Sequence, residues 1–153
     1  MTWPVVELDP ITRLRAIAAA YPNAGVAEAV VDVPFEEAWA WVTDFERNVH
    51  RFDTEVAKIR IRHRDGGRVR LWAWARFVPI PLPFDVTVED GFCIMRGRVR
   101  AFLVVMAAAP TADGRTRYVH AEAVPLPGVG WLRRLVQRVV DRDVRGFVRH
   151  VGT

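Results

Sequence analysis

Polar and hydrophobic residues alternate through most of the middle of the chain, and this period of two predicts β-strands. Residues 57–64, for example, set Ala57, Ile59 and Ile61 against basic neighbours. Glycine-containing turns such as residues 65–67 separate these segments, so neighbouring strands are expected to pair antiparallel. Seven segments are predicted to form strands: 26–33, 57–64, 68–77, 84–89, 92–96, 99–109 and 116–124.

Other regions show helical spacing instead. Asp9 can cap a short helix that starts at Pro10. Residues 34–48 begin with a proline and carry two glutamates in the first turn, as a helix N-terminus prefers, and a second short helix is expected over 47–53. Residues 131–150 place leucines and valines on one face and arginines on the opposite face, which predicts a long amphipathic helix.

After the N-terminal helix, the predicted order is one strand, two short helices, six successive strands and a long final helix. Antiparallel strands with segregated helices define an α+β fold. A helix of about twenty residues spans about 30 Å, enough to lie across a sheet of this size. Because one helix cannot fill the space under a strongly curved sheet, we expect a cavity between helix and sheet.

The segment VDVPFEEAWAWVTDFER (31–47) resembles the strand-to-helix opening of the START-like, birch-pollen-allergen-like (SRPBCC) superfamily, which includes polyketide cyclases and dehydratases. The element order is similar over residues 26–151. The resemblance implies a helix-grip fold, in which a curved seven-stranded antiparallel sheet wraps around the C-terminal helix. It divides the chain into an N-terminal helical extension, 1–25, and a START-like domain, 26–153. It also implies an internal pocket for an apolar molecule such as a lipid or an aromatic polyketide, without fixing one chemistry.

Composition indicates one cytoplasmic domain. The 153 residues are 51% hydrophobic, which argues against disorder. Cys93 is the only cysteine, so no internal disulfide can form and a reducing compartment is expected. The N-terminus lacks the apolar core of a signal peptide, and the longest apolar run, 101–109, is too short to span a bilayer as a helix. The arginine, alanine and valine bias indicates a GC-rich coding sequence, as in many bacteria.

The net charge of +4 is concentrated in one element. Residues 131–150 hold six arginines and two aspartates, a surplus equal to the whole net charge. A basic helix face of this kind is most simply a solvated outer surface. It can also dock on an acidic protein or make peripheral contact with an anionic membrane.

Asp143 is the first candidate for chemistry, because it lies at the centre of the apolar face of the last helix. A carboxylate there is desolvated, so it either acts as an acid, base or ligand anchor, or pairs with an arginine or the backbone. His120 and Glu122 share one face of the last strand and would join Asp143 if that face pointed inward. The opposite face, with Val119 and Ala121, is the more apolar one, so we expect His120 and Glu122 to point outward.

Hydrophobic residues near the predicted pocket are candidates for ligand binding. Trp72 and Trp74 either stack on a ligand or form the outer face of their strand with neighbouring arginines. Prolines at 79, 81 and 83 predict a stiff loop at the same rim as residues 125–128, where Ile80 and Leu82 would form an apolar gate. The full set of candidates is Trp39, Trp72, Trp74, Phe77, Ile80, Leu82, Leu126, Trp131, Leu135 and Val139.

Several kinds of site are not expected. The four histidines show no metal-ligand spacing, no glycine-rich phosphate loop is present, and no nucleic-acid-binding or cofactor motif is found. The favoured function is therefore binding of a hydrophobic small molecule. One alternative is a polyketide cyclase/aromatase- or dehydratase-like enzyme that uses Asp143, assisted by His120 and Glu122. A further alternative is an interaction protein that docks through its arginine-rich helix.

Overall fold

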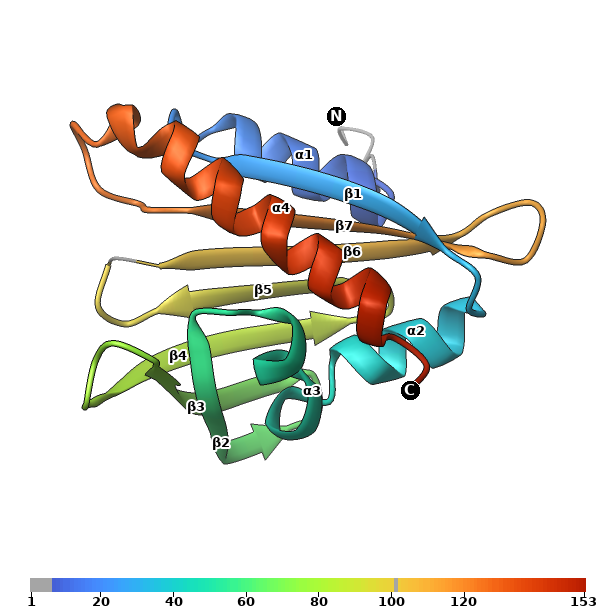
Figure 1. Ribbon diagram of the computed structural model, residues 1–153, viewed down its shortest axis with the longest axis horizontal. Helices are drawn as coiled ribbons and strands as arrows, with labels where there is room; N and C mark the ends of the chain where they lie inside the picture. The colour runs from blue at the N-terminus through green and yellow to red at the C-terminus, as the bar shows by residue number, and fades with distance from the viewer. Residues whose placement is uncertain (1–6, 101) are drawn as a thin grey trace, which may run out of the picture.

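The computed structural model describes residues 7–100 and 102–153. Seven antiparallel strands form one curved sheet in the order β1-β7-β6-β5-β4-β3-β2 (Figure 1). This is the helix-grip α+β architecture that the sequence predicts. The elements are α1 (Pro10–Ala19), β1 (Gly25–Val31), α2 (Phe35–Val42), α3 (Phe45–Phe52), β2 (Val56–Asp65), β3 (Arg68–Ala75), β4 (Pro81–Glu89), β5 (Phe92–Gly97), β6 (Leu103–Pro110), β7 (Thr116–Ala123), the short 3₁₀-helix η1 (Gly130–Leu132) and α4 (Arg133–His150).

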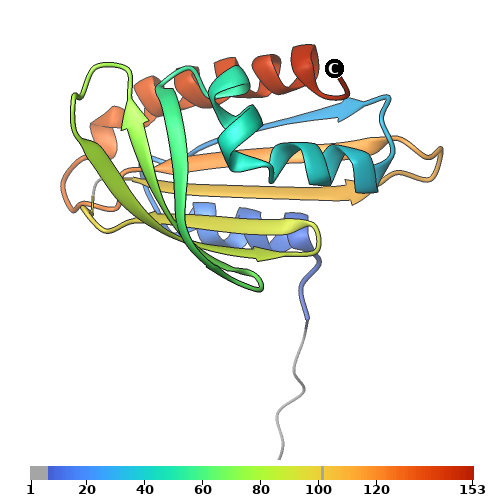
Figure 2. The same cartoon turned by 90° about the horizontal axis from the view of Figure 1, so that it is seen from below.

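Helices cover both faces of the sheet. Figure 2 shows α4, α2 and α3 on the concave face and α1 on the convex face. Gln137 fixes α4 over β1, because its side chain both donates to the Val26 carbonyl (2.8 Å) and accepts from the Val26 amide (3.0 Å). Gly25 permits this approach, since a Cβ there would lie 2.9 Å from the Gln137 backbone. No helix among the described residues is both long and apolar enough to cross a membrane.

Each face of the sheet has its own hydrophobic core. On the concave side, Phe52 and Phe147 pack on Tyr118, whose ring stacks on that of Phe147 at 4.0 Å. On the convex side, Leu14 of α1 packs on an apolar surface that includes Val119. Burial on both faces explains why β5, β6 and β7 contain apolar residues at consecutive positions. The predicted domain boundary at residue 25 remains a prediction, but α1 clearly shares a core with the sheet.

Removing the N-cap of α1 is expected to weaken the protein slightly. The Asp9 carboxylate accepts hydrogen bonds from the Thr12 amide (3.0 Å) and the Thr12 hydroxyl (2.6 Å). Loss of such a cap costs about 1 kcal/mol, so Asp9→Ala should lower the free energy of unfolding by that amount in urea titrations. Asp9→Asn, which keeps the acceptor, is the control and should lose much less. Equal stability of the wild type and Asp9→Ala would contradict this account.

The first of the two helices expected after β1 was predicted to continue to residue 48, but it ends earlier and the second begins earlier. α2 ends at Val42 and α3 begins at Phe45. The Trp39 carbonyl accepts hydrogen bonds from both the Thr43 amide (3.1 Å) and the Thr43 hydroxyl (2.7 Å). Threonine and aspartate favour helix ends because their side chains compete for backbone hydrogen bonds. The break turns α3 toward α4 and brings residues 53 and 54 beneath it.

The proline stretch is partly strand, so the prediction of a loop over 79–83 was wrong. β4 begins at Pro81, and Leu82 pairs with Ala73 of β3. In a strand, alternate residues direct their backbone groups to the same side. Pro81 and Pro83 therefore direct the side of the backbone that lacks an N–H group away from β3. On that side β5 no longer pairs with β4, so strand formation loses no hydrogen bond. The Pro83 carbonyl accepts from the Arg98 amide at 2.9 Å.

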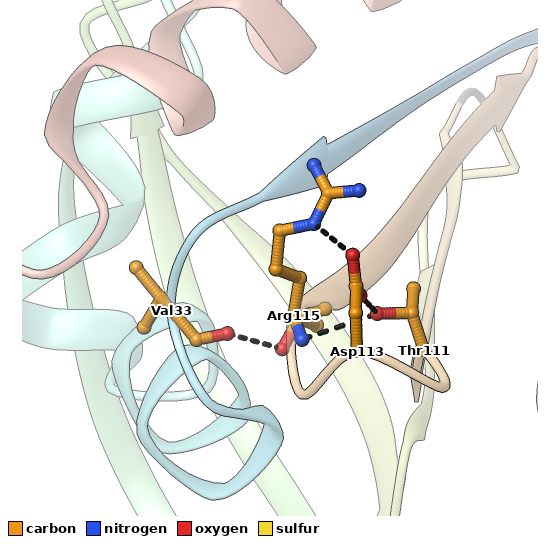
Figure 3. Close-up of polar contacts among 5 residues, drawn as sticks. Val33, Thr111, Asp113 and Arg115 are labelled. Atoms are coloured by element: carbon orange, nitrogen blue, oxygen red, sulfur yellow. Dashed lines mark hydrogen bonds and ion pairs between the residues drawn. The ribbon is translucent and has the colours of Figure 1, made fainter.

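The end of the sheet opposite the prolines is held by polar contacts (Figure 3). In the β6–β7 turn, Asp113 pairs with Arg115 at 2.8 Å and accepts from the Thr111 hydroxyl. The Thr116 hydroxyl donates to the Val33 carbonyl at 2.6 Å, which ties the start of β7 to the β1–α2 connection. This end is therefore polar and closed by its own contacts.

Candidate functional site

Five polar or ionisable side chains meet inside the concave core. β7 contributes Tyr118, His120 and Glu122, whose side chains share the face that points toward α4. The segment after α3 contributes Asp53, and α4 contributes Asp143. Tyr118 and Asp143 are fully buried, His120 is 1% exposed and the Glu122 side chain is 19% exposed. We call this group the interior polar cluster.

The three β7 side chains form a continuous hydrogen-bonded chain. The Tyr118 hydroxyl lies 2.9 Å from Nδ1 of His120, and Nε2 of His120 lies 3.0 Å from Oε1 of Glu122. Residues two apart in a strand point to the same side, so the alternation of β7 itself produces this alignment. When the Tyr118 hydroxyl donates to Nδ1, the neutral imidazole carries its proton on Nε2 and donates it to Glu122.

Asp143 has an unsatisfied acceptor in the interior. Its Oδ1 accepts from the Thr54 amide at 3.2 Å, while Oδ2 finds no hydrogen-bond partner among the described residues. Burial, followed by the nearby charge of Asp53, raises the pKa of Asp143 to about 9. The carboxyl is therefore protonated near neutral pH and can donate a hydrogen bond or a proton.

The neighbouring carboxyls are also perturbed. Burial, followed by repulsion from Glu122, raises the pKa of Asp53 to about 7, and burial raises the pKa of Glu122 to about 7. Burial lowers the pKa of His120, so its neutral form is favoured. Among the described residues, no arginine or lysine forms an ion pair with any of the three carboxyls. Protons must therefore neutralise most of this cluster.

Such a cluster has the groups for general acid–base chemistry, since groups with pKa values near 7 and 9 lie side by side. It also has the groups for a metal site. One potential ligand atom each from His120, Glu122 and Asp143 lies within 4.8 Å of the other two, and an imidazole with two carboxylates suits a divalent transition metal. The sequence predicted no metal site because ligands from different elements leave no regular spacing.

The structure brings all three predicted catalytic candidates together. The expectation that His120 and Glu122 point outward was wrong. Val119 and Ala121 do form a core, as their apolar character suggested, but it is the second core beneath α1. Because α1 covers the convex face, β7 is buried on both sides, and its polar face is directed to the interior.

Trp72 and Trp74 are on the wrong side of β3 for the predicted ligand contacts. Val69, Leu71 and Ala73 of the same strand face the concave core, which places the two tryptophans on the outer face. There the Arg62 guanidinium lies 4.5 Å from the Trp72 ring and the Lys58 ammonium 5.4 Å from the Trp74 ring. These cation–π contacts explain how large aromatic side chains are kept on the surface of the sheet.

The other ligand-binding candidates fall into two groups, and their contact with a ligand remains a prediction. Trp39 is buried in the concave core, and its indole N–H donates to the Glu89 carbonyl at 3.2 Å. Leu82 and Val139 are half-buried at the proline-rich end. The exposed candidates are Phe77, Ile80, Leu126, Trp131 and Leu135.

Sequence reasoning did not select Asp53 or Phe102. Asp53 follows a short helix in an ordinary capping position, so nothing local marks it as part of a site. Phe102 has the same strand parity as Val104 and packs on Phe84, with ring centroids 6.3 Å apart. That parity could have placed it on the concave side. Tyr118 shares the face of His120 and Glu122 by strand alternation, so the same period of two could have added it to the cluster.

No family model and no curated protein sequence matches the chain, but solved structures do. A START superfamily protein from Mycobacterium smegmatis is 15% identical, with a TM-score of 0.63 over 84% of this chain and 96% of that one. The Zhui aromatase/cyclase from Streptomyces sp. R1128 is 12% identical, with a TM-score of 0.59 over 82% and 88%. The di-domain ARO/CYC StfQ from the steffimycin biosynthetic pathway is 11% identical, with a TM-score of 0.65 over 88% and 51%.

The chain has a START-like fold. At these identities the likeness shows the fold alone, so function depends on the side chains that this chain places on it. Within the START-like fold, the interior polar cluster is formed by three elements, β7, α4 and the segment after α3.

Proposed function

We propose that the protein binds a small, mainly apolar molecule on the concave side of the sheet and acts on it by general acid–base catalysis, in a cyclase- or dehydratase-like reaction. One observation carries the proposal: His120, Glu122 and Asp143 converge, beside Asp53 and Tyr118, in an interior that is mainly apolar. Burying several unpaired carboxyls is costly, and perturbed groups of this kind gather at catalytic sites.

Glu122 is where a bound molecule would meet the cluster. It is the most exposed member, and on the sheet it lies beside Val104 of β6. From Val104 toward the proline-rich end, the concave side continues with Phe102, which is 43% exposed, and with half-buried Leu82. A molecule lying on these apolar side chains would have its inner end at Glu122.

The cluster supports both halves of such a reaction. The Glu122 carboxylate, hydrogen-bonded to His120, would take a proton from a carbon next to a carbonyl group. The resulting enolate would attack a second carbonyl of the same molecule to form a carbon–carbon bond, and the protonated Asp143 would supply the proton to the new alkoxide. In a dehydration, the same acid would protonate the hydroxyl group that leaves as water. Holding a flexible chain in the reactive shape would contribute as much as the acid and base.

The test begins with native mass spectrometry of protein purified from its own host, to find a co-purified small molecule. That molecule is then returned to fresh wild-type protein. A product of the same mass with a different chromatographic retention time indicates cyclisation, and a product lighter by one water indicates dehydration. A co-purified molecule that is released unchanged after long incubation would contradict the catalytic part of the proposal.

Binding without catalysis is the second candidate, and the burial of the cluster favours it. Tyr118, His120 and Asp143 are at most 1% exposed, so a ligand would contact only Glu122 unless α3 and α4 separate. In this case Glu122 acts as a hydrogen-bonding anchor. The same incubation, analysed by chromatography and mass spectrometry, separates the two candidates, because an anchored ligand keeps both its mass and its retention time.

An aspartate at position 80 should impair uptake of an apolar ligand. Ile80 is 61% exposed at the proline-rich end, so Ile80→Asp should leave the free energy of unfolding unchanged. It should slow ligand entry, because an apolar ligand would have to displace water from the carboxylate as it passes. Leu82 packs against the concave core, and an aspartate there would also destabilise the fold. The measurement is stopped-flow uptake of the co-purified molecule, without lipid present. Val148→Asp, at the far end of α4, is the control; equal rates for the two variants would refute the gate.

A further inference from the structure

The two ends of the sheet differ in charge. The β3–β4, β5–β6 and β7–α4 connections lie at one end, together with the first turns of α4 (Figure 1). We call this the arginine–apolar end and define it as residues 76–83, 97–100, 102 and 124–138. These segments contain six arginines and no acidic residue. The turns at the opposite end contain Asp65, Asp90 and Asp113.

The arginine–apolar end also carries the most exposed hydrophobic side chains. In the part of the chain that the structure describes, five large hydrophobic residues are more than half exposed, and all five lie here: Phe77 (83%), Ile80 (61%), Val99 (54%), Trp131 (78%) and Leu135 (58%). They come from three connections and a helix, so their clustering does not follow from one unusual segment. Exposed hydrophobic side chains gathered at one end of a protein point to an interaction site.

The arginines lie close to these apolar side chains. Arg133 and Arg134 share the first turn of α4 with Leu135, and Arg98 and Arg100 flank Val99. At this end, a surface hollow of about 620 Å³ is lined by Arg96, Arg98, Arg100 and Phe102 among others. Arg98 pairs with Asp85, which also lines the hollow. The surface therefore combines apolar tips with guanidinium groups that can bind phosphate.

We propose that the arginine–apolar end docks on an anionic lipid bilayer, with the apolar tips entering the interface and the arginines binding the phosphates of the headgroups. Charge complementarity selects this occupant, because an anionic bilayer offers phosphates at its surface and an apolar phase directly below. Tryptophan is enriched at membrane interfaces, where its amphipathic ring sits at headgroup level. The proposal is independent of the acid–base function assigned to the interior polar cluster.

The outer face of α4 does not supply the docking surface along its whole length. Arg142, farther along the helix, lies 3.6 Å from Glu55 in an ion pair and also contacts the Thr54 hydroxyl. Residues 133–138 hold three arginines and no acidic residue, whereas residues 139–150 hold three arginines and two aspartates. The surplus of positive charge is therefore larger at the start of the helix. In this orientation the long axis of the sheet points away from the bilayer surface, and the polar β6–β7 turn lies farthest from the lipid.

Sedimentation with lipid vesicles tests the proposal. The wild type should bind vesicles of phosphatidylcholine mixed with phosphatidylglycerol and bind much less to phosphatidylcholine alone. Raising the salt concentration from about 0.1 M to about 1 M shortens the Debye length from about 10 Å to about 3 Å and should weaken binding strongly. Trp131→Ser should lower the partition coefficient about tenfold, and Arg133→Gln and Arg134→Gln should each lower it roughly fivefold.

Val148→Ser is the control, because Val148 is a partly exposed hydrophobic residue in the last turn of α4, away from this end. Its partition coefficient should equal that of the wild type. Absence of wild-type binding to the anionic vesicles would overturn the proposal, as would equal binding by Trp131→Ser. Sedimentation velocity covers the alternative occupant: a dimer that Trp131→Ser abolishes, without any vesicle binding, would show that this end binds a second copy instead.

Discussion

Replacing Asp143 with asparagine is expected to make the protein more stable than the wild type at pH 9. Asp143 is fully buried, and burial together with the charge of Asp53 raises the pKa of its carboxyl to about 9. Asparagine has nearly the shape of the protonated acid and carries no charge at any pH. The variant should therefore keep the packing of α4 while it removes a group that must ionise inside the core as the pH rises.

Proton linkage sets the sign of this effect. The folded-state pKa of Asp143 lies above its ordinary value of 3.8, so near neutral pH the folded protein holds a proton that the unfolded chain has released. This contribution to stability is complete below the ordinary pKa and is lost as the pH rises through about 9. Between the ordinary and the raised pKa, each pH unit lowers the free energy of unfolding by about 1.4 kcal/mol. The wild type should therefore lose about 2–3 kcal/mol of stability between pH 7 and pH 9.

The other cluster members change this estimate little. The pKa values of Asp53 and Glu122 are raised to about 7, so these carboxyls have lost most of their protons before pH 9 is reached. The pKa of His120 is lowered, so stability linked to its neutral form is lost only as the pH falls through its ordinary value of 6.5. Above pH 7, the ionisation of Asp143 therefore accounts for most of the loss of stability.

Urea unfolding at pH 7 and pH 9, with EDTA present to remove bound metal ions, measures the effect. The wild type should become less stable between the two, and Asp143→Asn should change by less than about 1 kcal/mol. Asp141→Asn is the matched control: it lies on the same helix, and Gln137 can still donate to its side-chain oxygen, as it does to Asp141 at 2.9 Å. A wild type that is equally stable at both pH values would show that Asp143 is already ionised at pH 7.

Most of the fold could be predicted because its signals are local. Period-two alternation and glycine-containing turns mark the strands, and the wheel of residues 131–150 marks α4. The proline stretch was misread because a proline excludes a strand only when its missing N–H faces a partner. Pro81 and Pro83 direct that side away from β3, a fact that depends on where β5 ends. The break between α2 and α3 was missed because both halves continue one apolar stripe.

The candidate site could be predicted only in part. Asp143 stood out because a helix wheel fixes its face from the sequence alone. The orientation of β7 could not be fixed in the same way, since both of its faces are buried and the choice depends on what α1 covers. Asp53 enters the cluster through the α2–α3 break, a tertiary consequence that no spacing reveals. Convergence of residues from three elements is therefore the information that the structure adds.

Replacing Glu122 with glutamine is expected to abolish most of the proposed catalysis while it leaves ligand binding intact. Glutamine can still accept or donate a hydrogen bond where the Glu122 carboxyl lies 3.0 Å from His120, but it cannot take up a proton. Loss of a general base lowers the rate by roughly 10²- to 10⁴-fold. Because the Glu122 side chain is 19% exposed, the change should cost little stability.

The measurement is single-turnover conversion of the co-purified molecule, with its dissociation constant determined separately for each variant. Glu36→Gln, an exposed position in the first turn of α2, is the control and should match the wild type in both. If catalysis is correct, Glu122→Gln retains affinity and loses conversion, since the base acts mainly in the transition state. If Glu122→Gln loses affinity and the wild type shows no conversion, Glu122 is an anchor and the protein binds without reacting. If conversion persists, the base lies elsewhere and the interior polar cluster has another purpose.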